Sequence, residues 1–208
     1  MVITCLLDRS GSMQSCLDDT IGGYNAFLQT SDQNDLISLY LFDHEFAEVY
    51  KDKLISEAEP LKRATFIPRG PTALLDAIAK VLEIDDTPKT VVIITDGDEN
   101  ASKIQTYNNI SNLISAKKEL GWQFIFMGAN QDAIETACRM SITAGSTLTF
   151  DTQNIDAAFS SASQAIKRSQ ECGRDIQFTE LEREKSLVAK RESSQSASDS
   201  QDVVVDRV

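Results

Sequence analysis

The sequence predicts an α/β fold in which a doubly wound sheet carries helices on both faces. Short, nearly continuous apolar segments alternate along the chain with stretches whose apolar residues recur at helical spacing. This order of strands and helices is typical of doubly wound sheets, which bind ligands at the carboxyl ends of their strands. The chain has 208 residues, of which 41% are hydrophobic and 25% charged, so we expect a single, well-buried core.

Four apolar segments predict the inner strands, and they lie at residues 2–7, 36–42, 91–94 and 124–127. Because nearly all of their residues are apolar, we expect both faces of these strands to be buried in a parallel sheet. Residues 46–50 follow a turn at Asp43 and His44 and should form a short antiparallel edge strand beside residues 36–42. Residues 148–150 would close the opposite edge of the sheet.

Four amphipathic stripes predict the helices that cover this sheet. Their apolar residues recur three or four positions apart, which places them on one face of a helix. The stripes are Leu17, Ile21, Tyr24 and Leu28; Leu75, Ile78, Ala79 and Leu82; Ile110, Leu113 and Ile114; and Ile155, Phe159, Ala162 and Ile166.

The chain changes character after Cys172. Residues 173–208 have no strong apolar stripe, and residues 186–200 contain six serines. Such a segment buries too little apolar surface to offset the entropy of ordering it. We therefore expect one domain over residues 1–172 and a polar tail over residues 173–208, disordered or partly helical, with a transient helix near residues 180–192.

The charge balance excludes several classes of partner. There are 20 Lys and Arg against 32 Asp and Glu, a net charge of −12, so we expect neither nucleic-acid nor membrane binding. No apolar run reaches the roughly 18 residues that cross a bilayer. Residues 1–7 lack the basic segment and cleavage pattern of a signal peptide, so we expect a cytoplasmic protein.

The four cysteines are scattered and predict reduced structural thiols. Cys5, Cys16, Cys138 and Cys172 form no C-x-x-C pair, and His44 is the single histidine. Neither a zinc cluster nor a disulfide scaffold is indicated. A Ser-His-Asp or Cys-His hydrolase is improbable as well, because its chemistry would have to run through His44.

Oxygen-bearing side chains gather where the predicted strands end. The first strand runs into Asp8-Arg9-Ser10-Gly11-Ser12, the one D-x-S-x-S sequence in the chain. The strand at residues 91–94 runs into Thr95-Asp96-Gly97-Asp98-Glu99-Asn100, and Thr72 lies at the start of a predicted helix. The carboxyl ends of parallel strands meet at one edge of a sheet. We therefore predict one site formed by Asp8, Ser10, Ser12, Thr72 and Asp96.

Hydroxyls and carboxylates without thiols or imidazoles are the ligands of a hard cation, Mg²⁺ in preference to Zn²⁺, with Mn²⁺ or Ca²⁺ as alternatives. Serine and threonine before a helix also serve as N-caps, and Asp-Gly is common in turns. The metal interpretation is favoured because all five residues fall at the same predicted sheet edge, in strand-loop-helix context. Two carboxylates would roughly balance a dication and leave a coordination position open to a partner.

These five positions resemble the metal-ion-dependent adhesion site, or MIDAS, of von Willebrand factor A domains. Residues 20–25 and 95–100 look like a compact bacterial and phage-type subgroup. The resemblance covers residues 1–172 and implies a mostly parallel six-stranded, Rossmann-like sheet. It also implies that the serines and the threonine contact the metal directly or through water, that the aspartates act through water, and that an acidic side chain of a partner completes the coordination.

The function implied by this resemblance is a metal-dependent protein interaction module, an intracellular adaptor and not an enzyme. Relatives of this kind serve beside AAA+ ATPases or in tellurite-resistance-type stress systems, so the expected partner is such a protein presenting an Asp or Glu. The chain has no G-x-x-x-x-G-K-[ST] motif for ATP itself.

Three charged residues beside the motif are candidates for the rim of the site or for positions behind the metal ligands, where they would tune the field at the metal. Asp98 and Glu99 follow Asp96, and we expect them to be solvated rather than to bind the metal directly. Arg9 lies inside the motif, where we expect it to point outward and to be available to an acidic partner.

Two other interpretations stay open. Asp96-Gly97-Asp98 superficially resembles the strand end of haloacid-dehalogenase-type phosphatases, in which Mg²⁺ and a carboxylate share the reaction. That class would place its nucleophile on the first core strand, and Asn100 stands where it would have Thr or Val. The third interpretation is a purely structural subunit whose motif binds nothing.

Overall fold

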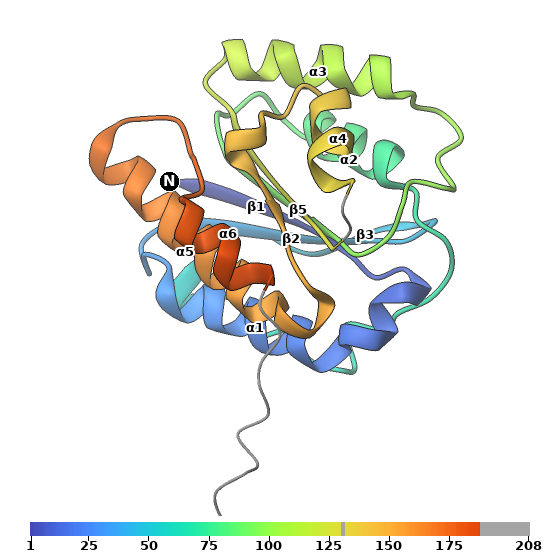
Figure 1. The fold of residues 1–208 in the computed structure, drawn as a ribbon, viewed down its shortest axis with the longest axis horizontal. Coiled ribbons are helices and arrows are strands. Elements are labelled where there is room, and N and C mark those ends of the chain that lie inside the picture. Colours follow the sequence, from blue (N-terminus) through green and yellow to red (C-terminus); the bar gives the residue numbers. More distant parts are fainter. Residues whose placement is uncertain (130–131, 188–208) are drawn as a thin grey trace, which may run out of the picture.

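The computed structural model describes residues 1–129 and 132–187, which form one six-stranded sheet between two layers of helices (Figure 1). The strand order is β3-β2-β1-β4-β5-β6. The strands are β1 (Val2–Asp8), β2 (Leu36–Phe42), β3 (Phe46–Leu54), β4 (Thr90–Thr95), β5 (Gln123–Gly128) and β6 (Thr147–Thr149). All neighbouring strands are parallel except β2 and β3, the predicted antiparallel pair. The predicted mostly parallel, doubly wound sheet is confirmed.

The helices divide between the two faces of the sheet. One face is covered by α1 (Leu17–Thr30) and α5 (Ile155–Cys172). The other is covered by α2 (Leu74–Glu83), α3 (Tyr107–Glu119) and α4 (Ala133–Arg139). Short 3-10 helices occur at η1 (Gly11–Cys16), η2 (Ile55–Glu57), η3 (Ala144–Ser146) and η4 (Thr152–Asn154). The four predicted amphipathic stripes fall in α1, α2, α3 and α5.

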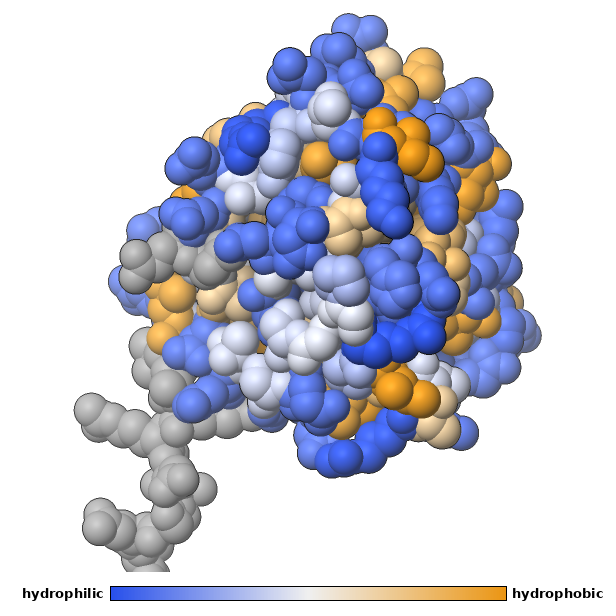
Figure 2. All heavy atoms as spheres, turned by 90° about the vertical axis from the view of Figure 1, so that its right-hand side faces the viewer, coloured by the Kyte–Doolittle hydropathy of each residue, from blue (hydrophilic) through white to orange (hydrophobic). Residues whose placement is uncertain are grey.

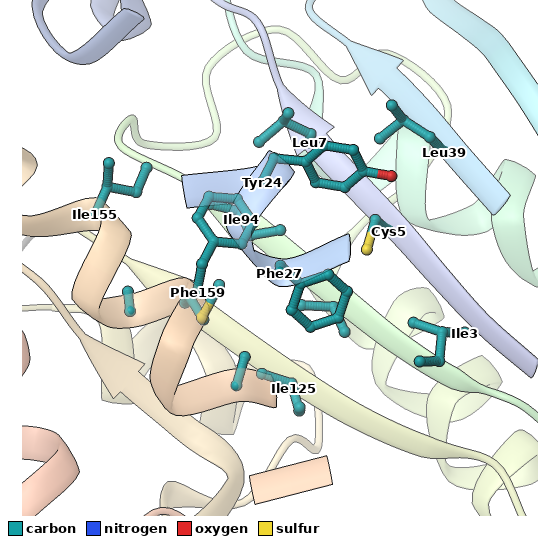
Figure 3. Close-up of a cluster of buried hydrophobic side chains, with 14 of the residues drawn as sticks. Ile3, Cys5, Leu7, Tyr24, Phe27, Leu39, Ile94, Ile125, Ile155 and Phe159 are labelled. Carbon is teal, nitrogen blue, oxygen red and sulfur yellow. The ribbon is translucent and has the colours of Figure 1, made fainter. Parts of the chain in front are cut away.

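Aromatic side chains fix the contact between α1 and α5 (Figure 3). The rings of Tyr24 and Phe159 meet edge-on with centroids 6.1 Å apart, and Phe27 lies 6.3 Å from Phe159. A Cβ at Gly23 would lie 2.6 Å from Phe159 Cδ2, so the two helices can approach this closely only with glycine at that position. A Cβ at Gly22 would meet no atom within 4 Å.

The segment after α5 is folded, which corrects the predicted domain boundary at Cys172. Ile176 and Phe178 are only 3% and 7% exposed, and α6 (Glu180–Leu187) follows them. The folded domain therefore includes the whole of α6. The rest of the predicted tail, residues 188–208, lies outside the described residues.

Polar contacts hold this segment, so its docking leaves no apolar stripe in the sequence. Arg183 donates hydrogen bonds to the backbone carbonyls of Thr147, at 2.7 Å, and Ala144, at 2.8 Å. Arg168 pairs with Glu182 at 3.0 Å. These contacts cover β6, an edge strand whose open carbonyls would otherwise be available to another chain.

The described chain holds no helix that is both long and apolar enough to cross a membrane. All four cysteines are free thiols, with Cys5 and Cys16 buried and Cys138 and Cys172 exposed.

Candidate metal centre

The five predicted ligand residues lie on three loops at the carboxyl edge of the parallel strands, on the right of Figure 1. β1 ends at Asp8, and the chain continues through Ser10 and Ser12 into η1. β4, the parallel neighbour of β1, ends directly before Asp96, and Thr72 lies just before α2. Figure 2 turns this edge toward the viewer and shows a mainly hydrophilic surface. Such a surface suits a charged ligand better than an apolar one.

A chain of hydrogen bonds joins the two serines to the second aspartate. Ser12 Oγ donates to Asp96 Oδ1 at 2.6 Å, and the hydroxyls of Ser10 and Ser12 lie 3.0 Å apart. Because the Ser12 proton is engaged by Asp96, Ser10 must be the donor to Ser12. The carboxylate therefore sets the direction of both hydroxyls.

Thr72 joins this group at Gly97. A Cβ at Gly97 would lie 3.1 Å from Thr72 Oγ1, 3.2 Å from Ser12 Oγ and 3.7 Å from Ser10 Oγ. Three hydroxyl oxygens from separate loop positions thus surround one small space that glycine leaves open. Gly97 was not predicted as part of the site, although its place directly after a strand-end aspartate was a usable signal.

Asp8 is fully buried beneath these hydroxyls. Its Oδ1 accepts a hydrogen bond from the Ser10 backbone N–H, and its Oδ2 accepts one from Thr95 Oγ1, both at 2.6 Å. Burial raises the pKa of the Asp8 carboxyl to about 6, although the hydrogen bonds from Thr95 and Ser10 act in the opposite direction. The charge of Asp96 adds to the rise.

The carboxyl group of Asp96 is also partly removed from solvent, which disfavours its charged form. Burial raises the pKa of its carboxyl, and the hydrogen bond from Ser12 opposes that rise. None of the ion pairs within residues 1–129 and 132–187 involves Asp8 or Asp96. Two neighbouring, partly desolvated carboxylates therefore lack a cationic side chain to balance them.

The residues present fit a divalent cation. In the described parts of the chain, no group of three or more His, Cys, Asp and Glu side chains could hold a metal, so hydroxyls must contribute ligands here. Hydroxyl and carboxylate oxygens suit hard cations such as Mg²⁺. A dication would also relieve the repulsion between Asp8 and Asp96. Ser12 is exposed and Asp96 half-buried, so the site opens to solvent on their side.

Arg9 does not point outward, which corrects that expectation. Its Nε donates to Asp43 Oδ2 at 2.9 Å, and only 12% of its side chain is exposed. Asp43 is fully buried and also accepts a 2.9 Å hydrogen bond from Arg69 Nε. The backbone N–H of Arg69 donates to the Arg9 carbonyl at 2.8 Å. Asp43 therefore ties the D-x-S-x-S loop to the loop that carries Thr72.

Glu99 is not a solvated rim residue, which corrects a second expectation. One of its carboxylate oxygens accepts from the backbone N–H groups of Ala101 and Ser102, at 3.0 and 2.7 Å. The other accepts from the Leu75 N–H at 2.9 Å and from Ser102 Oγ at 2.7 Å. Asp98 is exposed. Glu99 thus acts within the protein and not on a ligand.

No protein-family model matches the chain, and no curated protein sequence is similar to it. Solved structures with the same architecture do exist. A von Willebrand factor type A protein from Catenulispora acidiphila has 16% identity and a TM-score of 0.62, over 79% of this chain and 42% of that one. The vWF domain of the type V pilus tip protein Mfa5 from Porphyromonas gingivalis has 13% identity and a TM-score of 0.62, over 86% and 97%.

A third similar structure is proximal thread matrix protein 1 from the mussel byssus, described with a zinc-occupied MIDAS motif. It has 13% identity and a TM-score of 0.56, over 86% of this chain and 48% of that one. The chain thus spans less than half the length of this protein and of the Catenulispora protein. Strand order, helix layers and this likeness agree: the chain has the fold of von Willebrand factor type A domains.

Proposed function

We propose that this protein is a non-enzymatic interaction module that binds a divalent cation and, through it, a carboxylate of a protein partner. The cation would be held by Asp8, Ser10, Ser12, Thr72 and Asp96. The observation that carries the proposal is the convergence of three hydroxyls at Gly97, beside two carboxylates that no Lys or Arg of the described residues neutralises. The likeness in fold to a protein described with a zinc-occupied MIDAS motif supports it.

The protein's own groups would divide the work. The Ser12 hydroxyl donates a hydrogen bond to Asp96, which leaves a lone pair on Ser12 Oγ available to a metal ion. Buried Asp8 would supply negative charge and hold the backbone of the Ser10 loop. A bound cation would supply a Lewis-acidic position for the partner's oxygen. We propose Mg²⁺ as the native cation, with Mn²⁺ or Ca²⁺ as alternatives.

The partner would present an Asp or Glu on an otherwise neutral or basic surface. A net charge of −12 repels acidic proteins in general, whereas the cation attracts one carboxylate at one place, and the contrast provides specificity. By its resemblance to adaptor domains, we propose a cytoplasmic role beside an AAA+ ATPase or a stress-system component.

A phosphatase of the haloacid-dehalogenase type has less support. Its nucleophile would belong on the first core strand, and the only carboxylate at the end of β1 is Asp8. Asp8 is fully buried, with a hydrogen bond to each of its oxygens, so it is poorly placed to attack a substrate. Hydrolysis of p-nitrophenyl phosphate that depends on both Mg²⁺ and Asp8 would reverse this preference.

Isothermal titration calorimetry with Mg²⁺, Mn²⁺, Ca²⁺ and Zn²⁺ tests the metal site. We expect wild type to bind, and Asp96→Ala to lose binding because it removes both a charge and the acceptor that orients Ser12. Metal at a hundredfold excess over Kd should stabilise wild type by about 2.7 kcal/mol and leave Asp96→Ala unchanged. Asp151→Ala is the matched control, since Asp151 follows β6 at the same sheet edge but its side chain caps Gln153.

Equal Mg²⁺ binding by wild type and by an Asp8→Ala, Asp96→Ala double variant would end the proposal. The partner is tested separately, by affinity purification from the source cells in Mg²⁺ and in EDTA. A partner should be retained in Mg²⁺, released by EDTA and missed by Ser12→Ala. A partner that is retained in EDTA and is also retained by Ser12→Ala would bind elsewhere on the surface.

A further inference from the structure

We infer that Asn100 is a positioning residue for the candidate metal site and that it acts through Thr72. The inference rests on the proposed function, because Thr72 matters in this way only if it is a ligand. Asn100 lies in the loop after β4, four positions beyond Asp96, and belongs to none of the predicted ligand positions. What it contacts is the backbone of a different loop.

Asn100 holds the main chain of Thr72 from both sides. The Thr72 backbone N–H donates to Asn100 Oδ1 at 2.9 Å. In return, the Thr72 carbonyl accepts from the backbone N–H of Asn100 at 3.0 Å and from that of Ala101 at 3.1 Å. A residue whose N–H and C=O are both bound to the same neighbour cannot rotate without breaking these bonds. The Cα–Cβ bond of Thr72, from which its hydroxyl projects, is therefore fixed in direction.

The start of α2 needs this help because it lacks a cap of its own. Ala73 occupies the N-cap position and has no side-chain hydrogen bond to offer. The free N–H groups of the first turn are instead satisfied from the loop after β4: Glu99 accepts from Leu75 at 2.9 Å, and Ser102 Oγ accepts from Asp76 at 3.1 Å.

Asp76 returns the contact from α2 to the same loop. Its carboxylate accepts from the backbone N–H groups of Lys103, at 2.8 Å, and Gln105, at 2.8 Å. Each element thus caps the other. Thr72 before α2 and Asp96 after β4 are carried by one rigid unit, although they lie far apart in sequence.

Within this unit, the Asn100 side chain binds a predicted ligand residue directly, and its hydrogen bond can be removed by truncating one side chain. Asn100 is exposed, whereas Thr72 is 2% exposed, so truncating the side chain removes the hydrogen bond without opening a hole in the core. Asn100→Asp keeps an oxygen acceptor for the Thr72 N–H, and it serves as the conservative variant that should restore the function.

The chain offers a matched control at Asn25. There Oδ1 of the carboxamide accepts from the Leu61 N–H at 2.7 Å, as Asn100 Oδ1 does from Thr72, and Nδ2 also donates to the Leu61 carbonyl at 3.0 Å. Asn25 lies inside α1, away from the candidate ligands. Asn25→Ala therefore also removes a carboxamide that accepts from a backbone N–H, in the segment before α2, but it leaves the hydrogen bonds of the Thr72 backbone in place.

The test is Mg²⁺ titration by calorimetry of wild type, Asn100→Ala, Asn100→Asp and Asn25→Ala. Loss of a residue that orients a metal ligand typically weakens affinity about 10- to 100-fold, which is the loss we expect for Asn100→Ala. Asn100→Asp and Asn25→Ala should bind within about threefold of wild type. Amide hydrogen exchange of the metal-free proteins adds a second readout, in which the Thr72 amide should exchange faster in Asn100→Ala alone.

The outcomes separate the two claims. Wild type that binds none of Mg²⁺, Mn²⁺ and Ca²⁺ overturns the proposed function. Wild type that binds, together with an Asn100→Ala variant of equal affinity, overturns only the positioning role. An equal loss of affinity in Asn25→Ala, or unchanged exchange at Thr72 in Asn100→Ala, also overturns that role, because the effect would then be one of general stability.

Discussion

Gly97 is the residue around which the hydroxyls of the candidate site gather. A Cβ there would lie 3.1 Å from Thr72 Oγ1 and 3.2 Å from Ser12 Oγ, closer than most side-chain contacts allow. Its φ is not in the left-handed region, so the backbone itself would accept another residue. Glycine is needed at this position because a side chain would crowd the hydroxyls of Thr72 and Ser12.

We expect Gly97→Ala to abolish or strongly weaken Mg²⁺ binding while the metal-free protein stays folded. The added methyl would occupy the space between the three hydroxyls and displace at least one of them. Calorimetry gives the affinity, and urea denaturation without metal gives the free energy of unfolding.

Gly22→Ala is the control for this change. A Cβ at Gly22 would meet no atom within 4 Å, and this residue lies inside α1. Replacing a helical glycine should stabilise the protein by up to about 1 kcal/mol and leave Mg²⁺ affinity unchanged. Undiminished Mg²⁺ affinity in Gly97→Ala would show that the cation does not sit among these hydroxyls.

The sequence could predict the five candidate ligands because each follows a strand or precedes a helix. A rule about sheet edges then brings them together. Asp43 could not be assigned in this way, because its role depends on Arg9 and Arg69, which are distant in sequence. The same holds for the contact of Glu99 with the Leu75 N–H, which links it to α2. Periodicity and short motifs carry no information about such pairs.

Among the elements, α6 is held by charge more than by apolar contact. Burial alone would raise the pKa of the Glu182 carboxyl, but hydrogen bonds from Arg168 and Thr179 outweigh it and hold the pKa below its ordinary value of 4.5. A lowered pKa means that the folded state favours the ionised form. The resulting stability is fully present above pH 4.5 and is lost as the pH falls through the lower, folded-state pKa.

We therefore expect Glu182→Gln to destabilise the protein by about 1 to 2 kcal/mol near neutral pH. The difference from wild type should shrink as the pH falls below 4.5, because wild type then loses the same interaction. Urea denaturation across this range measures both effects. Glu180→Gln, an exposed position on the same helix, should show neither; a gap between wild type and Glu182→Gln that persists at low pH would contradict the ionic explanation.

Element prediction succeeded where apolar residues are periodic and failed where they are not. The inner strands and four helices were predicted from such patterns. β3 extends to Leu54, beyond the predicted end at residue 50, because much of this edge strand is exposed and polar. α4 is short and was not predicted from the sequence. The docking of α6 depends on arginine contacts to backbone carbonyls, which leave no periodic signal.

For the whole molecule, these contacts extend the folded domain beyond Cys172 and through α6. A variant ending at Leu187 keeps these contacts and serves as the reference. A variant ending at Cys172 loses the burial of Ile176 and Phe178 and should be destabilised by about 3 kcal/mol or more. It should also associate with rising concentration, because β6 becomes an open sheet edge.

Thermal unfolding and light scattering of the two variants measure this difference. The variant ending at Leu187 controls for the removal of residues 188–208 alone. Equal melting temperatures and equal monodispersity in both variants would restore the boundary at Cys172.

The apolar core and the polar contacts of the loops differ in how freely their residues can be exchanged. This difference decides which residues are useful for recognising proteins with the same site. Aliphatic and aromatic core residues replace one another at small cost when volume is kept, so the core can drift without losing the fold. Gly97, whose absent side chain makes room for three hydroxyls, has no such substitute. Identities of 13% to 16% over a shared architecture therefore show a shared fold and carry no information about the site. A protein with the same site is better recognised by the three short loops that carry the predicted ligands, together with Gly97, than by its overall sequence identity.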